Sequence, residues 1–248
     1  MEKPTKYITL RFYEELNDFL PSDKNKTSYR YFYFGNPTIK DVIESEGVPH
    51  PEVDMILVNG KSVDFNYRIK KGDRISVYPV FESFDIGRIT EVRSEPLRKI
   101  RFIADAHLGK LARLLRLLGF DTLFRNDFED EEVANIGSLQ ERIILTRDKE
   151  LLKRSNVVKG YWIRNTDSKE QAREVIRRFH LESLFKPFNR CMVCNGILDK
   201  VEKSTVIDEI PEKPREFYRD FYRCDTCHKV YWRGTHYDRL KTWIDSIN

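Results

Sequence analysis

The sequence predicts an α/β protein made of three successive blocks, and three observations support that class. Residues 1–84 show short strand patterns around one helix, residues 98–186 alternate strand and helix, and residues 187–248 hold two cysteine pairs. Alternation of strands and helices indicates a parallel sheet covered by helices. Paired cysteines indicate a small metal-stabilised module. We therefore expect three domains with these boundaries.

The composition predicts a soluble protein with a heavily solvated surface. Of the 248 residues, 40% are hydrophobic and 34% are charged, and the net charge is +4. The first residues, MEKPTKYITL, show no apolar core of a signal peptide. No run approaches the roughly 18 to 20 apolar residues that cross a bilayer. We expect a cytoplasmic protein without membrane contact, and the modest positive charge permits nucleic acid as a partner.

The first block is a series of short alternating runs with one helix. Strands are expected at 7–13, 29–34 and 74–81, and a helix at 37–48, where a proline and a threonine precede apolar residues on one face. The Asn-Gly pair at 59–60 is a strong hairpin signal. Strand, strand, helix and then strands is the order of a β-grasp fold.

This block resembles the ubiquitin-like sulfur carriers, mainly in ILVNGKSV and IKKGDRISVYPVF. The resemblance implies a ubiquitin-like domain, but such carriers act through a free C-terminal Gly-Gly pair. The corresponding stretch here, VFESFDIG, has no such pair, and the chain continues. We therefore expect a binding or docking module, with a protein as its partner, and no sulfur transfer.

The second block repeats strand and helix four times. The helix GKLARLLRLLG should stop at Gly119, since glycine commonly follows the last helical residue. The expected strands are 99–104, 121–125, 143–146 and 157–164, and the expected helices are 109–119, 126–142, 147–155 and 167–181.

Three acids of the second block are predicted to meet. Asp105 and Asp148 follow two strands, and Asp130 opens the helix between them, with Glu131 as a substitute. Ligands of parallel α/β sheets bind beyond the carboxyl ends of the strands. Carboxylates that stay ionised together usually need a cation, and Mg²⁺ or Mn²⁺ suits their oxygens. Such a site would hydrolyse phosphodiesters.

Each acid also has a simpler explanation. Asp148 can cap a helix, and Asp130 can complement a helix dipole. Asp105 is harder to explain in this way, because a hydrophobic strand and a leucine-rich helix flank it closely. For His107, next to it, we expect a structural role rather than substrate contact.

Basic residues stand close to these acids. Lys110, Arg113 and Arg116 follow Asp105 along one helix, and Arg147 precedes Asp148. Side chains three or four residues apart share a helix face, so this group could receive RNA phosphates. A solvated face opposite the leucines explains the helix residues equally well.

The third block carries the strongest single signal of the chain. Cys191, Cys194, Cys224 and Cys227 form two CxxC pairs, the pattern of a tetrahedral structural zinc site without an open position. Neither His228 nor His236 is needed to complete that set. The following YWRGTHY stretch could stack on unpaired bases, although packing of its aromatic residues against the ribbon is the preferred reading.

Taken together, FIADAHLGKLARLLRLLGFDT, DFEDEEV, RIILTRDKELLKR and the cysteine pairs ending in YWRGTHYDRL resemble the Mut-seven C-terminal ribonuclease domain family. The resemblance implies a PIN-like nuclease fold joined to a zinc ribbon and preceded by a ubiquitin-like domain. It also implies a metal-dependent ribonuclease in which Asp105, Asp130 and Asp148 are the acids. Asp167 is the expected fourth acid, although helix capping explains it equally well.

We therefore predict a metal-dependent endoribonuclease. It would use Mg²⁺ or Mn²⁺ for catalysis and a structural Zn²⁺ in a ribbon that helps to bind RNA. The alternative is a non-catalytic adaptor of the same fold that binds RNA or protein.

Overall fold

The computed structural model describes residues 6–79 and 100–247. The chain divides into two compact units, residues 1–99 with 134–162 and residues 100–133 with 163–248. The predicted domain ends at 84 and 98 lie outside the described residues, and the three domains stay a prediction. Within the described ranges, none of the helices is both long and apolar enough to span a membrane.

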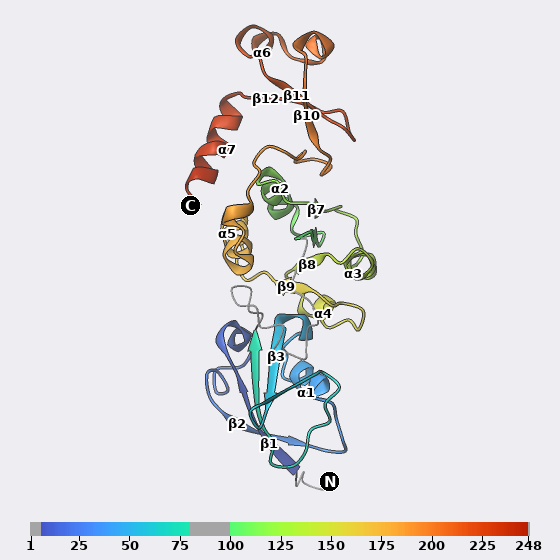
Figure 1. Ribbon diagram of the computed structural model, residues 1–248, viewed down its shortest axis with the longest axis vertical. Helices are drawn as coiled ribbons and strands as arrows, with labels where there is room; N and C mark the ends of the chain where they lie inside the picture. The colour runs from blue at the N-terminus through green and yellow to red at the C-terminus, as the bar shows by residue number, and fades with distance from the viewer. Residues whose placement is uncertain (1–5, 80–99, 248) are drawn as a thin grey trace. The chain divides into compact units, whose positions relative to one another are not determined.

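A five-stranded sheet forms most of the first unit (Figure 1). Strand β1 pairs in parallel with β5, whereas β1 with β2, β3 with β4 and β3 with β5 are antiparallel. The order across the sheet is β2-β1-β5-β3-β4, which places the last long strand beside the first. The strands are β1 (Lys6–Phe12), β2 (Tyr29–Tyr33), β3 (Val53–Val58), β4 (Lys61–Val63) and β5 (Arg74–Pro79).

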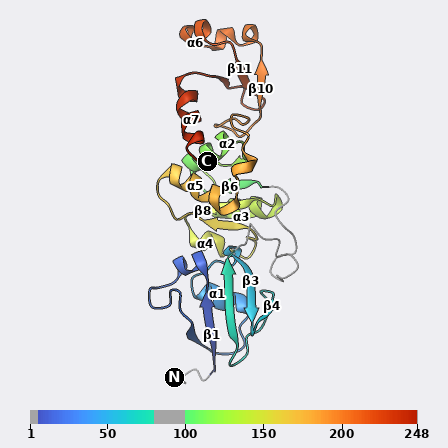
Figure 2. The same cartoon turned by 60° about the vertical axis from the view of Figure 1, so that its left-hand side comes forward.

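One face of this sheet is covered by α1 (Ile39–Ser45), as both ribbon views show (Figures 1 and 2). Thr38 caps the helix through a capping box, in which its side chain and that of Asp41 each accept from the other's backbone N–H. Asn59 and Gly60, both with positive φ, form the tight turn between β3 and β4. The β-grasp order expected from the sequence is confirmed.

The first unit also contains a parallel pair of strands, β8 (Ile143–Thr146) and β9 (Gly160–Trp162). Helix α4 (Lys149–Leu152) lies between them in sequence and is shorter than the expected helix at 147–155. Helix α3 (Asp130–Leu139) precedes β8. Two short 3-10 turns, η1 (Glu14–Phe19) and η2 (His50–Glu52), belong to the N-terminal part of this unit.

The second unit holds the other parallel pair, β6 (Phe102–Ala104) and β7 (Thr122–Leu123). Helices α2 (Gly109–Leu117) and α5 (Ser168–Phe179) bury apolar faces in the same unit. Gly119, with φ of 98°, ends the α2 segment, and a Cβ there would lie 2.4 Å from the carbonyl oxygen of Lys186. The α/β class with parallel strands and helices is confirmed.

The C-terminal part of the second unit is a three-stranded antiparallel sheet with a very small core. Its strands are β10 (Leu198–Val201), β11 (Phe221–Cys224) and β12 (Val230–Trp232), and it includes two 3-10 turns, η4 (Lys203–Thr205) and η5 (Ile207–Glu209). This part also contains two helices that were not expected from the sequence, α6 (Glu212–Phe217) and α7 (Thr235–Asp245). Helix α7 was not expected from the sequence, because its first turn lies within the aromatic and basic YWRGTHY stretch.

Candidate functional site

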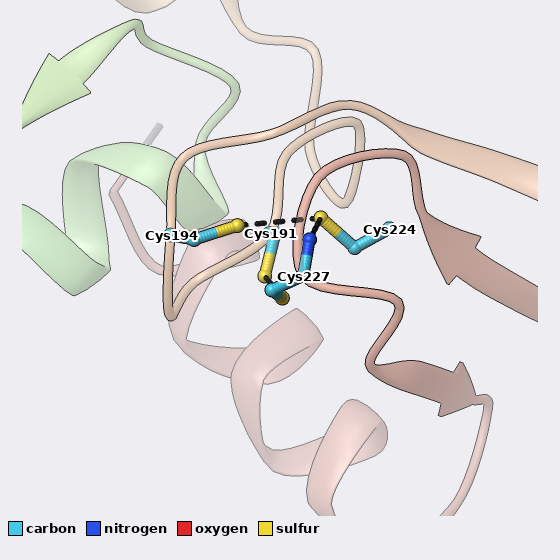
Figure 3. A group of neighbouring side chains, drawn as sticks. All are labelled: Cys191, Cys194, Cys224 and Cys227. Atoms are coloured by element: carbon cyan, nitrogen blue, oxygen red, sulfur yellow. Dashed lines mark hydrogen bonds between the residues drawn. The ribbon is translucent and has the colours of Figure 1, made fainter.

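The four cysteines gather at one point (Figure 3). Their Sγ atoms all lie within 4.8 Å of one another, with 3.6 Å between Cys191 and Cys227 and 3.3 Å between Cys194 and Cys224. Among the described residues, this is the group of three or more metal-ligating side chains close enough to share an ion. Four thiols at this spacing could hold one Zn²⁺ ion, with no position left for substrate.

The two CxxC loops have the same backbone geometry. The amide of Asn195 donates to the Cys191 carbonyl at 3.0 Å, and the amide of His228 donates to the Cys224 carbonyl at 3.1 Å. Both donors have positive φ, 74° and 60°, so each chain segment turns sharply after its second cysteine. Each loop therefore points its two thiols at a common centre, as a structural zinc site requires.

Tyr231 supports this cluster from β12. Its hydroxyl lies 3.1 Å from the Cys191 Sγ, and its own pKa is raised by burial and by that hydrogen bond. Burial also raises the pKa of the Cys191 thiol, but hydrogen bonds from Tyr231 and from two backbone amides outweigh it and bring the pKa to about 7. Each of these hydrogen bonds favours the thiolate, the form in which cysteine binds metal. His228 is exposed and lies outside the group.

Arg116 has a role that the sequence did not predict. Its side chain is almost fully buried, at 2% exposure. Its Nε donates to the Thr122 carbonyl at 2.8 Å, and Nη1 donates to the carbonyls of Met192 and Val193 at 3.3 and 2.7 Å. Arg116 is therefore not available to RNA phosphates, contrary to the prediction. It joins α2 to β7 and to the first cysteine loop.

Asn195 makes a second link between the same parts. Its Oδ1 accepts from the backbone N–H of Thr122 at 3.0 Å, and its Nδ2 donates to Asp121 Oδ1 at 2.8 Å. Asn195 is thus part of the cysteine loop and also extends the hydrogen bonding of β7. Together with Arg116, it fixes the first cysteine loop to the α/β part of the second unit.

We expect Arg116→Ala and Arg113→Ala to behave differently although they share one helix. Loss of Arg116 leaves buried carbonyls without a donor and should lower the free energy of unfolding by about 3 kcal/mol. Arg113 is exposed, so its loss should change stability little and weaken RNA binding. Chemical denaturation and RNA affinity of both variants give the measurement. Equal stability of the two variants would contradict the assigned role of Arg116.

Asp105 lies where the strand β6 passes into the helix α2. It is buried, and its Oδ1 accepts from the backbone N–H of His107 at 2.8 Å. The His107 ring is exposed, with its Nδ1 3.7 Å from the same oxygen. The carboxylate thus has a fixed position at the carboxyl end of a parallel strand, four residues before α2 begins. The structural contribution of His107 comes from its backbone.

Asp148 and Asp167 both cap helices. The Asp148 side chain accepts from the Glu150 amide at 2.8 Å at the start of α4. The Asp167 side chain accepts from the amides of Lys169 and Glu170 at 2.9 and 3.1 Å at the start of α5. Capping, the alternative weighed for both, is therefore seen. Each carboxylate is exposed, and a capping carboxylate retains lone pairs for another ligand.

The segment that carries Asp148 is held by the N-terminal part of the first unit. Lys149 Nζ lies 4.2 Å from the Trp162 ring and 4.8 Å from the Phe19 ring, and the two rings are 5.1 Å apart. The Trp162 indole donates to the Arg147 carbonyl at 3.2 Å. Its backbone N–H donates to the fully buried Glu52 at 2.5 Å. The ubiquitin-like part thus contacts the residues next to a candidate acid.

Asp130 is the first residue of α3, and its side chain is exposed. Glu131 and Glu132 share the first turn, where carboxylates also complement the helix dipole. Arg147 is exposed beside Asp148. The elements thus place each predicted acid at a strand end or at a helix start, and their meeting around one ion stays a prediction.

A large groove lies entirely within the second unit. Its volume is about 1200 Å³, and it is bounded by α2, the start of α5, the first cysteine loop, the ribbon strands, α6 and α7. Among the residues that the structure describes, seven basic and seven aromatic side chains line it, and none of the lining residues is an aspartate or glutamate. The basic residues are Lys110, Arg113, Lys169, Arg190, Lys213, Lys229 and Arg233, and the aromatic residues are Phe188, Phe217, Tyr218, Tyr222, Tyr231, Trp232 and Tyr237.

Two of these groove residues were predicted as RNA contacts, and most were missed. Lys110 and Arg113 are exposed on the wall formed by α2. Arg190 is used within the fold, since it donates to the carbonyls of Gly119 and Asn195 at 3.3 and 2.9 Å. The other basic residues come from distant positions between 169 and 233, and only the YWRGTHY stretch gave a signal in the sequence.

Comparison with known families agrees with this arrangement. Residues 100–244 match the model of the Mut7-C RNAse domain, and residues 5–85 match that of the Mut7-C ubiquitin domain. No match was found among curated proteins or among solved structures. The first match covers more than half of the chain. The protein therefore belongs to the Mut7-C RNAse domain family and carries a Mut7-C ubiquitin domain in front of it.

Proposed function

We propose that the protein is a metal-dependent endoribonuclease of the cytoplasm. In this proposal Asp105, Asp130 and Asp148 hold Mg²⁺ or Mn²⁺, with Asp167 as a fourth acid. The groove of the second unit holds the RNA strand. The family supports nuclease activity in general, and the metal dependence and the roles of these residues are what we propose beyond it.

The donor set suits a hard divalent cation. Carboxylate oxygens are the ligands that Mg²⁺ and Mn²⁺ favour, whereas the four thiols suit Zn²⁺. When bound, such an ion would stabilise the charge on the phosphate and lower the pKa of water. Asp105 contributes a carboxylate whose direction is fixed by the His107 amide, so little reordering is needed for it to act as a ligand.

The groove is the observation that carries the proposal of RNA as substrate. Six of its cations are exposed: Lys110, Arg113, Lys169, Lys213, Lys229 and Arg233. No carboxylate stands among the described lining residues, so the local charge is far more positive than the chain's net +4 implies. Cations that follow a phosphate backbone, with aromatic rings for the bases, characterise single-strand binding sites.

The groove also connects to the candidate acids along the chain. Lys110 and Arg113 belong to α2, the helix that follows Asp105, and Lys169 is two residues after Asp167. The zinc ribbon supplies another wall through Tyr222 and Trp232. In this proposal the zinc has a structural role, and the ribbon aids RNA binding.

A non-catalytic adaptor with the same groove would also bind RNA. The two functions differ in what Asp105 does, because a buried carboxylate at a strand end contributes nothing to phosphate binding. A protein partner of the ubiquitin-like domain is compatible with either function.

The groove is tested by a triple variant, Arg113→Ala/Lys213→Ala/Lys229→Ala. Binding of a single-stranded RNA should weaken by at least about tenfold at 0.1 M salt, and the salt slope should become shallower by about 2. The KM for cleavage should rise with kcat nearly unchanged, because these side chains bind substrate away from the acids. The measurement is RNA affinity and cleavage across a salt series.

The matched control removes three exposed lysines from outside the groove, as Lys61→Ala/Lys71→Ala/Lys241→Ala. It loses the same formal charge, so it should lower affinity only slightly. If the two triple variants lose equal affinity, the groove has no special role and the proposed RNA path is wrong.

A further inference from the structure

The five-stranded sheet of the N-terminal domain has a second face, which α1 does not cover. Residues alternate along its strands, and the inward set, including Ile8, Leu10 and Val77, forms the core with α1. In β2 the inward tyrosines reach the end of α1, since the Tyr29 hydroxyl bonds to Glu46 and the Tyr31 hydroxyl to Ser45. Arg30 and Phe32 therefore point to the open face.

Aromatic and arginine side chains are grouped on this open face. Tyr7 of β1 pairs with Phe32 of β2, their rings are 5.9 Å apart, and the Arg30 guanidinium lies 4.8 Å from the Tyr7 ring centre. Phe32 is 52% exposed, and Phe34 just beyond the strand is 65% exposed. Two exposed phenylalanines, one on β2 and one directly after it, indicate a surface that binds a partner.

A second group of the same kind lies on the neighbouring strands. The rings of Tyr13 and Tyr78 are stacked, with centres 4.3 Å apart and 14° between the planes. The guanidinium of Arg11 lies 4.9 Å from the Tyr13 ring centre. Arg11 belongs to β1 and Tyr78 to β5, which pair in parallel, so this group and the one around Tyr7 share one sheet surface.

The charge on this face is one-sided. Residues 6–79 contain eleven basic and eleven acidic residues, so the domain as a whole is balanced. The outward positions of the strands, by register with Tyr7, Thr9 and Arg11, include Arg30 and Arg74 but no carboxylate. Described strand positions that hold cations and no acid fit a polyanion rather than a mixed-charge protein surface.

We propose that this open face, centred on Arg30, Tyr7 and Phe32 and on Arg11, Tyr13 and Tyr78, is a binding site for single-stranded RNA. The bases stack on the exposed rings, and the guanidinium groups contact phosphates or stack in turn. A duplex has its bases stacked already, so the site selects single strands. This site rests on the proposed ribonuclease function in one respect only, which is that both bind single-stranded RNA.

The first test measures equilibrium binding of a labelled oligouridine to the full chain, without added Mg²⁺ or Mn²⁺. The Phe32→Ala variant should bind at least about fivefold more weakly, because it loses a ring on which a base stacks. Phe32→Trp should restore the affinity. Leu139→Ala removes another exposed apolar side chain, 85% exposed in α3, and should leave affinity unchanged.

The second test locates the contact directly. Ultraviolet crosslinking of oligouridine, followed by mass spectrometry, should give adducts on the peptides that contain Tyr7 or Phe32. An unchanged affinity of Phe32→Ala together with no adduct on these peptides overturns the proposal and leaves the face to a protein partner. An equal loss of affinity for a duplex of the same length also overturns it. Absence of cleavage alone bears on the nuclease site and not on this one.

Discussion

An Asp105→Asn variant is expected to bind RNA like the parent protein and to cleave it at least about 100-fold more slowly. Loss of a group that only orients a metal ligand already lowers activity by about 10- to 100-fold, and Asp105 is proposed as a ligand itself. Asparagine keeps the Oδ1 acceptor that the His107 amide uses, so the turn between β6 and α2 should persist. It loses the negative charge that a hard cation requires. The measurement is single-turnover cleavage with Mn²⁺, alongside thermal unfolding of the same preparation.

Asp127→Asn is the matched control for this variant. Asp127 is an exposed acid of the same unit, and it pairs with Arg125 at 2.9 Å outside the candidate site. Its loss should leave cleavage within about twofold of the parent, because exposed ion pairs contribute little. Undiminished turnover by Asp105→Asn, in protein free of contaminating nuclease, would support the adaptor instead.

A Cys224→Ser variant should lose its zinc and unfold the ribbon before the rest of the protein. The buried apolar residues at the core of the ribbon are few, Val206, Ile210 and Phe221. Structural zinc contributes about 10–16 kcal/mol of apparent binding free energy. That is comparable to the stability of a whole domain, about 5–15 kcal/mol. RNA binding should weaken as well, because β11 and β12 supply groove residues.

The control for this variant is Thr226→Ser in the same loop. It keeps the hydroxyl that donates to Asp225 at 2.7 Å and changes none of the four thiols. Metal content by elemental analysis, melting and RNA affinity should then match the parent. Mn²⁺ uptake by the acids should survive in Cys224→Ser, since thiols and carboxylates serve different ions. A zinc-free parent, or a Cys224→Ser variant that melts like it, would contradict the account.

Local patterns allowed much of the fold to be predicted. The Asn59-Gly60 turn, the Thr38 cap and the helix stop at Gly119 depend on neighbours in sequence, and each is confirmed. The cluster of four cysteines could also be predicted, because the CxxC spacing alone brings two thiols to one side of a loop. The length of α4 was overestimated, because the helix expected at 147–155 spans only Lys149–Leu152.

Roles that depend on distant contacts could not be predicted. Arg116 stands three residues after Arg113 and looks like its partner on a solvated face, yet its hydrogen bonds reach the carbonyls of residues 192 and 193. The same limit applies to the groove, whose cations come from α2, α5, α6 and the ribbon. Periodicity reports which side of a helix is polar, but it does not report what a polar residue meets.

The proposed function requires that this chain cut RNA with a divalent ion held by carboxylates. To test this, the purified full chain is incubated with a circular single-stranded RNA. One sample contains Mn²⁺, and in the other a chelator has removed hard divalent ions. The zinc content of both samples is monitored. We expect linear products with Mn²⁺, which only internal cleavage can give, and intact circles when Mn²⁺ is withheld but zinc is retained. Circles that stay intact with Mn²⁺, or equal cleavage in both conditions, would contradict the proposed function.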